Sequence, residues 1–202
     1  MPAGDIPIVY PFASEEFNIS KSRKNKKIRI LFAGRLTPDK GIYTLMWALH
    51  SPAITPDRFS VSVTNAGAHT PEGKIIHKLV KAHPNIYVIR AKKTPNAMAE
   101  LLASTDIVVM PSSVSWWGEM FGILSVEAQH AGCRVVASNS GGLPETDCGG
   151  LILVEPENPK ELEQGILEAS LIGRLSETER KAASKKFTLT ESVDKLLGVI
   201  DL

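Results

Sequence analysis

The stretch that decides the fold is IRILFAGRLTPDKGIYTLMWALH, residues 28–50. Its first residues, 28–33, are mostly apolar and predict a buried β-strand. A short polar loop follows at residues 34–40, and residues 41–50 are predicted to form a helix. A strand that leads into a helix through a short loop is the repeating unit of a parallel β-sheet, because parallel neighbours need a crossover connection.

The same alternation continues toward the C-terminus. Further strands are predicted at residues 59–64, 86–89, 106–110, 135–137 and 151–154, and helices at 72–82, 95–103, 121–131, 159–172, 176–185 and 190–200. Short, nearly all apolar strands between helices are typical of an α/β fold, here a Rossmann-like parallel sheet of about six strands with helices on both faces. Ligands of such sheets bind beyond the carboxyl ends of the strands, so the loops after strands should carry the chemistry.

The composition is that of an ordinary globular protein. The chain has 202 residues, of which 43% are hydrophobic and 22% charged, enough for one well-cored domain. Its net charge of +1 argues against a nucleic-acid partner held by a broad basic surface. The basic run at residues 21–29 is interpreted as an exposed linker, with contact to a polyanion as the alternative.

The two cysteines, Cys133 and Cys148, are too few for a disulfide framework or a zinc cluster. Cys133 precedes an apolar run and is predicted to be a small core residue. Reduced thiols, together with a start that does not resemble a signal peptide, predict a cytoplasmic protein. No apolar run approaches the roughly 20 residues of a membrane span.

The first loop with chemical potential runs from Gly34 to Gly41 and contains two cations, Arg35 and Lys40. A guanidinium and an ammonium beside a helix N-terminus, with close backbone approach at Gly34, suit a diphosphate. The glycine and lysine spacing is not that of a P-loop. The alternative is a surface loop with two solvated cations.

The second loop and the helix after it contain two glutamates, Glu119 and Glu127, on either side of Phe121-Gly122-Ile123. Ionised carboxylates only accept hydrogen bonds, so two of them in one turn suit the hydroxyls of two sugars, a hexose and a ribose. The helix mouth between them suits a phosphate. The alternative is that both glutamates are solvated surface charges.

Two further features allow two readings each. Residues 138–145 follow a strand and include Gly141-Gly142, a pair that permits either a positive φ or close packing near a ligand. Trp116 and Trp117 precede Glu119 and can stack on a sugar or simply pack against the loop. The five histidines show no spacing typical of metal ligands.

Taken together, the order of these motifs resembles a known family. A strand followed by Gly-Arg-Leu-x-x-x-Lys-Gly, then Pro-Ser, Glu-x-Phe-Gly-Ile-x-x-x-Glu-Ala and Gly-Gly-Leu-Pro-Glu is similar to the C-terminal domain of the retaining glycosyltransferases of GT-B fold, group 1, family 4 type. The resemblance runs from about residue 6 to the end. It implies that residues 1–27 are a linker from a missing N-terminal acceptor domain, and that residues 28–202 are the nucleotide-sugar-binding half of a GT-B fold.

The resemblance also implies roles for single residues. Catalysis would involve Arg35 and Lys40, which bind the donor diphosphate, and Glu119, which holds hydroxyls of the transferred sugar. The donor-binding set implied is Gly34, Arg35, Lys40, Arg90, Ala91, Glu119, Phe121, Gly122, Ile123 and Glu127. In that set the backbone N–H groups of residues 121–123 face the sugar and phosphate, Glu127 binds the ribose, and the base lies near residues 90–92.

The chain departs from the family pattern at three loops, of which the stretch between Glu145 and Gly149 is shorter than usual. Arg90 stands where the family often has glycine, and only Gly67 remains of a glycine-rich turn at residues 65–69. What the resemblance implies for the whole enzyme is metal-independent hexosyl transfer in polysaccharide biosynthesis, without a cofactor. The acceptor is a glycan, lipid or small molecule, and peripheral membrane association of the full enzyme is compatible with it. The chain alone is expected to bind donor weakly and not to transfer sugar.

Other classes remain as alternatives. A sugar-nucleotide epimerase or a phosphorylase has the same two-domain shape but lacks the glutamate pairing. A non-catalytic nucleotide-binding or partner-docking module derived from a transferase is the non-enzyme alternative. A dinucleotide-binding dehydrogenase domain fits least, because no Gly-x-Gly-x-x-Gly follows the first strand.

Overall fold

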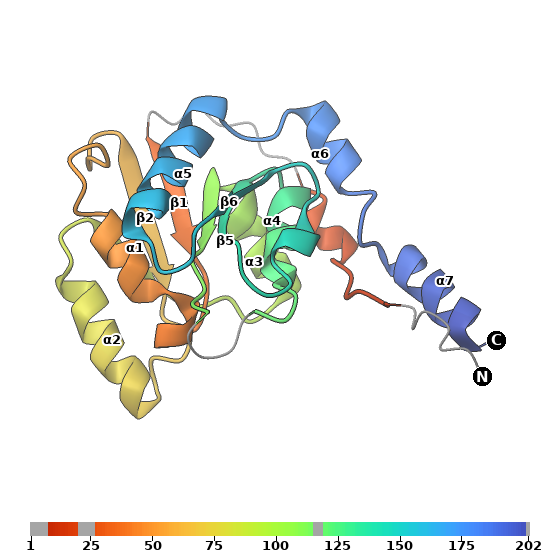
Figure 1. Ribbon diagram of the computed structural model, residues 1–202, viewed down its shortest axis with the longest axis horizontal. Helices are drawn as coiled ribbons and strands as arrows, with labels where there is room; N and C mark the ends of the chain where they lie inside the picture. The colour runs from red at the N-terminus through yellow and green to blue at the C-terminus, as the bar shows by residue number, and fades with distance from the viewer. Residues whose placement is uncertain (1–7, 20–26, 115–118, 201–202) are drawn as a thin grey trace.

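The computed structural model describes residues 8–19, 27–114 and 119–200. It confirms the predicted sheet, which has six parallel strands in the order β3-β2-β1-β4-β5-β6. Figure 1 shows the sheet with helices packed around it. The strands are β1 (Ile28–Phe32), β2 (Phe59–Thr64), β3 (Ile86–Ile89), β4 (Ile107–Met110), β5 (Arg134–Ser138) and β6 (Leu151–Val154). Every strand lies within two residues of its predicted bounds.

All seven predicted helices are present: α1 (Ile42–Ala48), α2 (Pro71–Ala82), α3 (Pro95–Ala103), α4 (Ile123–His130), α5 (Pro159–Ile172), α6 (Glu177–Ala183) and α7 (Leu189–Ile200). The prediction for α4 is wrong at its start, because Gly122 has a left-handed backbone with φ of 72° and caps the helix. Phe121 therefore lies in the loop. Short 3-10 helices, η1 (Glu15–Phe17), η2 (Pro38–Lys40) and η3 (Pro144–Thr146), were not predicted.

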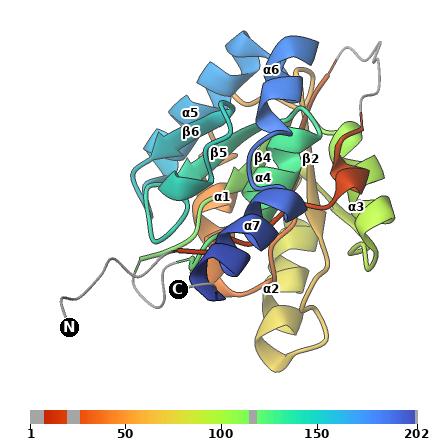
Figure 2. The same ribbon diagram turned by 90° about the vertical axis from the view of Figure 1, so that its right-hand side faces the viewer.

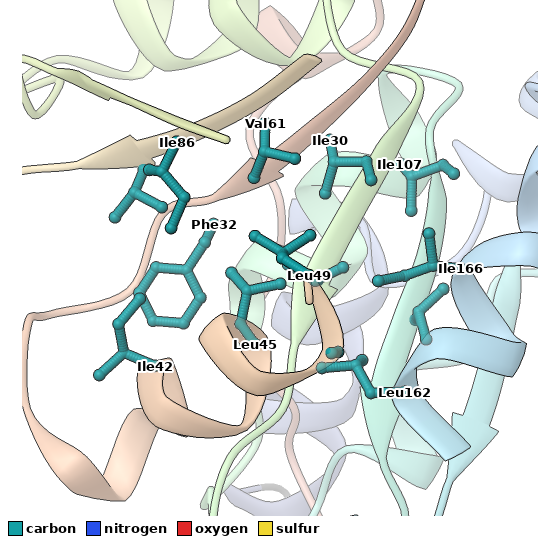
Figure 3. Packing of buried hydrophobic residues seen from close by; sticks show 14 of the residues in the cluster. Ile30, Phe32, Ile42, Leu45, Leu49, Val61, Ile86, Ile107, Leu162 and Ile166 are labelled. Carbon is teal, nitrogen blue, oxygen red and sulfur yellow. The ribbon is translucent and has the colours of Figure 1, made fainter. Parts of the chain in front are cut away.

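Each face of the sheet has its own apolar core. Along β1, Ile30 and Phe32 point into one core and Leu31 into the other, as the two-residue period of a strand requires. The first core lies under α1 and α5. Figure 3 shows Leu45 of α1 and Ile166 of α5 directed toward the strand residues between them. The sheet is therefore covered on both sides, and most of its strand residues are apolar for that reason.

The strand order reverses between β1 and β4. The chain runs from β1 outward through β2 to β3, then returns so that β4 pairs with β1 on its free side. Crossover connections on either side of such a reversal leave a crevice beyond the carboxyl ends of the two central strands. The loops that begin at Ala33 and Pro111 therefore start side by side.

Residues 8–19, called the leading segment below, pack on the rest of the domain. Phe17 is 2% exposed in the second core, and η1 contacts α3 (Figure 2). The backbone N–H of Ala13 donates to the carbonyl of Phe187, 3.0 Å away, so the segment before β1 is tied to the segment before α7. The basic run at residues 21–29 lies mostly outside the described residues. Among those described, no helix is long and apolar enough to cross a membrane.

Candidate functional site

A cavity of about 180 Å³ lies at the carboxyl ends of β1 and β4, where the strand order reverses. Its lining comes from both strands, both following loops and the start of α4: Phe32, Ala33, Gly34, Lys40, Val109, Met110, Ser112, Glu119, Gly122, Ile123 and Leu124. Five of the ten predicted donor-binding residues, including Lys40 and Glu119, thus border one cavity. Its lining combines apolar side chains with the charged side chains of Lys40 and Glu119.

The two charged residues of this cavity are paired. Lys40 Nζ lies 2.6 Å from Glu119 Oε2, and both side chains are 20% exposed. Lys40 Nζ is also 4.0 Å from Asp39 Oδ2, and the Ser112 hydroxyl donates to Glu119 Oε2 at 3.4 Å. An ammonium has three N–H donors, so Lys40 can bind Glu119 and still donate to an anionic ligand.

The loops after β1 and β4 touch through their backbones. The Ser113 N–H donates to the Asp39 carbonyl at 2.8 Å. Gly41 has φ of 69°, and a Cβ atom built on it would stand 1.7 Å from the Pro111 carbonyl oxygen. Only glycine fits this approach, and it is what brings Lys40 within reach of Glu119.

The Gly141-Gly142 turn after β5 holds the Glu119 loop from the other side. The Gly142 N–H donates to the Glu119 carbonyl at 2.8 Å. Cβ atoms on Gly141 and Gly142 would stand 2.1 Å from the carbonyl oxygens of Glu119 and Met120. The sequence analysis gave two possible reasons for these glycines, a positive φ or close packing near a ligand. Gly141 has a positive φ of 56° and also packs closely, but its close neighbour is the backbone of Glu119.

Five of the ten predicted residues do not line the cavity, and three of them, Arg35, Arg90 and Ala91, lie in the loops after β1 and β3. Arg35 is exposed at the rim, with Nη2 3.8 Å from Asp39 Oδ2. Arg90 and Ala91 follow β3, two strands along the sheet edge from β1. The Ala91 N–H donates to the Asn65 side chain at 2.8 Å, which joins the loops after β2 and β3. Two strand spacings correspond to about 10 Å.

Phe121 belongs to an aromatic cluster instead of lining the cavity. Its ring stacks on Tyr10, with centroids 5.2 Å apart, and meets Phe187 edge-on at 5.3 Å. The Tyr10 hydroxyl donates to Glu145 Oε2 at 2.5 Å, and this contact raises the pKa of Tyr10. The leading segment and the segment before α7 therefore hold the residue that precedes Gly122.

Glu127 lies in the second turn of α4, outside the cavity lining. Burial raises the pKa of its carboxyl to about 7. Among the described residues the structure gives its carboxylate neither a hydrogen-bond partner nor an ion pair. A partly buried acceptor of this kind suits a ligand hydroxyl.

We expect Glu127→Gln to stabilise the chain at pH 8 and to leave its stability almost unchanged at pH 4.5. The folded carboxyl holds its proton up to about pH 7, whereas the unfolded one releases it near its ordinary pKa of 4.5. The wild type therefore loses stability as the pH rises through that window, by about 3 kcal/mol. Urea unfolding of both chains over this pH range measures the difference. Parallel curves for the two chains would contradict the expectation, and Glu168→Gln, an exposed change on α5, is the matched control.

Two functional candidates were missed at the level of sequence. Ser112 lines the cavity and contacts Glu119, and its signal in the sequence was the Pro-Ser step of the family pattern, to which no role was assigned. Asn65 positions Ala91, and its signal was an asparagine at a strand end. Trp116 and Trp117 lie outside the described residues. The predicted core position of Cys133 is confirmed, since it is fully buried.

A second cavity, of about 660 Å³, lies between the leading segment and the α6–α7 region. It is larger than the first but lacks a comparable convergence of charged side chains. Within residues 8–19, 27–114 and 119–200, no group of three or more His, Cys, Asp or Glu side chains is placed to hold a metal ion. The charged cavity between β1 and β4 is therefore the candidate functional site of the described residues.

Comparison with known proteins gives the same picture. A family model described as glycosyl transferases of group 1 matches residues 27–170. The chain is 34% identical over 143 residues to an uncharacterized glycosyltransferase of Methanocaldococcus jannaschii, which covers 68% of this chain and 34% of that protein. It is 29% identical over 195 residues to a D-inositol 3-phosphate glycosyltransferase of Streptomyces bingchenggensis, with coverage of 84% and 42%. The chain thus spans about a third to a half of these relatives.

Solved structures show the same fold. A glycosyltransferase of Rickettsia africae superposes with a TM-score of 0.72 at 24% identity, over 87% of this chain and 48% of that one. The Anabaena protein HepE, solved in complex with UDP and glucose, superposes with a TM-score of 0.67 at 21% identity, with coverage of 87% and 48%. At these identities the likeness establishes the architecture.

Proposed function

Because this chain belongs to the group 1 glycosyl transferases, we propose that it is the donor-binding part of a retaining glycosyltransferase. The donor is a nucleoside diphosphate sugar, and the acceptor is a glycan, lipid or small molecule bound mainly by a further part of the protein. The observation that carries the proposal is the Lys40–Glu119 pair, 2.6 Å apart at the mouth of the cavity between β1 and β4. Cation and carboxylate side by side match a diphosphate joined to a sugar.

The donor would lie along the carboxyl edge of the sheet. The transferred sugar enters the cavity, where the Glu119 carboxylate accepts hydrogen bonds from the sugar hydroxyls. The diphosphate meets Lys40, and Arg35 reaches it from the rim. Farther along the edge, about 10 Å from β1, the loop with Arg90 and Ala91 takes the base. The Glu127 carboxylate accepts a hydrogen bond from a ribose hydroxyl.

UDP sugars are the first donors to consider. HepE of Anabaena was solved with UDP and with UDP-glucose. The cavity of about 180 Å³ is smaller than the roughly 300 Å³ or more of a typical ligand site, and this supports a site completed by a second part of the enzyme. We therefore propose that the isolated chain binds donor weakly and does not transfer sugar.

The proposed chemistry is transfer of a hexosyl group with retention at the anomeric carbon. As the bond to the diphosphate breaks, positive charge develops on the sugar ring and negative charge on the leaving group. Lys40, Arg35 and the N–H groups at Gly122 and Ile123 would stabilise the leaving group, so no metal ion or other cofactor is proposed. A cytoplasmic enzyme of polysaccharide biosynthesis, peripherally associated with a membrane, fits this chemistry.

Calorimetric titration of the chain with UDP, GDP and ADP, and with the corresponding glucose conjugates, tests the proposal. We expect one nucleoside diphosphate to bind measurably and more tightly than the other two. No binding of any of them would favour a non-catalytic docking module. Sugar transfer by the isolated chain to a simple glycoside would contradict the proposed need for a further part.

A further inference from the structure

Glu157 adopts a backbone conformation that L-amino acids avoid. Its φ is 56°, and in the described part of the chain only Phe187 is another non-glycine residue with a positive φ. A side chain in this left-handed region crowds its own backbone, which is why glycine and asparagine are favoured there. Strain of this kind persists where surrounding contacts hold the residue, and such contacts gather at functional sites.

A side-chain contact accompanies the strain. Glu157 lies in the loop after β6, and its Oε1 accepts a hydrogen bond from the hydroxyl of Ser113, in the loop after β4. Ser113 is 6% exposed, and its N–H donates to the Asp39 carbonyl at 2.8 Å. Ser113 is therefore the point at which the loops after β1, β4 and β6 are joined.

The joined segment, residues 111–113, borders the charged cavity through its middle residue, Ser112. Ser112 lines the cavity and donates to Glu119, while Pro111 abuts Gly41 of the loop that carries Lys40. On the β1 side the segment is held by backbone contacts. On the β6 side, the Glu157 carboxylate contacts this segment through its hydrogen bond with the Ser113 hydroxyl.

We propose that Glu157 is a positioning residue for the donor site. Its carboxylate holds Ser113 and thereby fixes Ser112 beside Glu119, and the left-handed backbone is what brings the carboxylate to that point. This inference rests on the proposed function, because it assigns Glu157 to the site that would bind the donor. The alternative is that Glu157 is a strained surface residue without effect on binding, and it predicts that substitutions of Glu157 leave the affinity for the donor unchanged.

Two variants of Glu157 separate these readings. Glu157→Gly removes both the carboxylate and the strain, so the thermal midpoint should stay the same or rise, while the affinity for the UDP probe falls about three- to tenfold, as for one lost hydrogen bond. Glu157→Gln keeps an oxygen that accepts from Ser113, and its affinity should stay close to that of the wild type. GDP and ADP are titrated in parallel. The control is Glu155→Gln, an exposed acid of the same loop, which should change neither quantity.

Hydrogen exchange of the Ser113 amide gives a readout that needs no ligand. We expect faster exchange in Glu157→Gly and in Ser113→Ala than in the wild type, and no change in Glu157→Gln. If the wild type binds none of the three diphosphates, the proposed function fails, while the exchange rates still decide whether the contact holds the loop. Unchanged exchange in Glu157→Gly, or wild-type affinity in that variant, would overturn the positioning role.

Discussion

Replacing Lys40 by Ala is expected to weaken binding of the preferred nucleoside diphosphate by about 10- to 100-fold, and to cost the full enzyme about 1–3 kcal/mol of transition-state stabilisation. Lys40 is the charged donor that the β1 loop presents to the cavity, with Nζ 2.6 Å from Glu119. The substitution also leaves the Glu119 carboxylate, which is only 20% exposed, without its cation. An unpaired carboxylate at the mouth would repel a diphosphate.

Calorimetry on the chain and rate measurements on the full enzyme check this result. The control is Lys78→Ala, which removes the same charge from an exposed position on α2 and should leave the affinity unchanged. Arg35→Ala should have a smaller effect than Lys40→Ala, because that side chain is 66% exposed at the rim. An equal loss of affinity in Lys40→Ala and Lys78→Ala would show that Lys40 acts only through the overall positive charge of the protein. An unchanged rate in the full enzyme would refute its assigned role.

Replacing Gly41 by Ala is expected to destabilise the chain by about 3–5 kcal/mol. The new Cβ atom would stand 1.7 Å from the Pro111 carbonyl oxygen, and the left-handed φ of 69° would be strained as well. The loops after β1 and β4 would have to separate, which would break the Ser113–Asp39 backbone hydrogen bond. Urea unfolding followed by far-UV circular dichroism measures the loss.

Gly67→Ala separates the two causes. Gly67 has a similar φ of 76°, but a Cβ atom there would come no closer than 3.5 Å to any neighbour. Backbone strain alone should cost about 1 kcal/mol at this position. A similar loss for Gly41→Ala and Gly67→Ala would show that the close approach to Pro111 is not what Gly41 is needed for.

Much of the fold was predictable because its signals are local. Six apolar stretches of strand length alternate with helical segments, and Thr94, Asn158 and Ser176 cap their helices with side-chain hydrogen bonds. Helix α4 shows where local reasoning stops. The apolar pattern continues through Phe121, but the left-handed Gly122 starts the helix at Ile123, and a hydrophobic pattern carries no information about φ.

The residues of the candidate site were predictable from the sequence, but the contacts between them were not. Lys40 and Glu119 were singled out for different portions of a ligand, from loops 79 residues apart, and the structure pairs them at 2.6 Å. That the Phe121 N–H faces the ligand stays a prediction, whereas only the structure shows that the Phe121 ring packs on Tyr10 and Phe187, which come from opposite ends of the chain. Ser113 and Glu157 carried no signal of their meeting.

The sequence by itself determined the elements, their order and the loops that carry charge, because hydrophobic periodicity, caps and turn residues act over a few positions. Only the tertiary structure decided which loops meet. Strand order put β4 beside β1, and backbone approaches at Gly41 and Gly142 then set the positions of Lys40 and Glu119. The physical reason is that these contacts join residues far apart in the chain, and packing of the whole sheet brings them within hydrogen-bond distance.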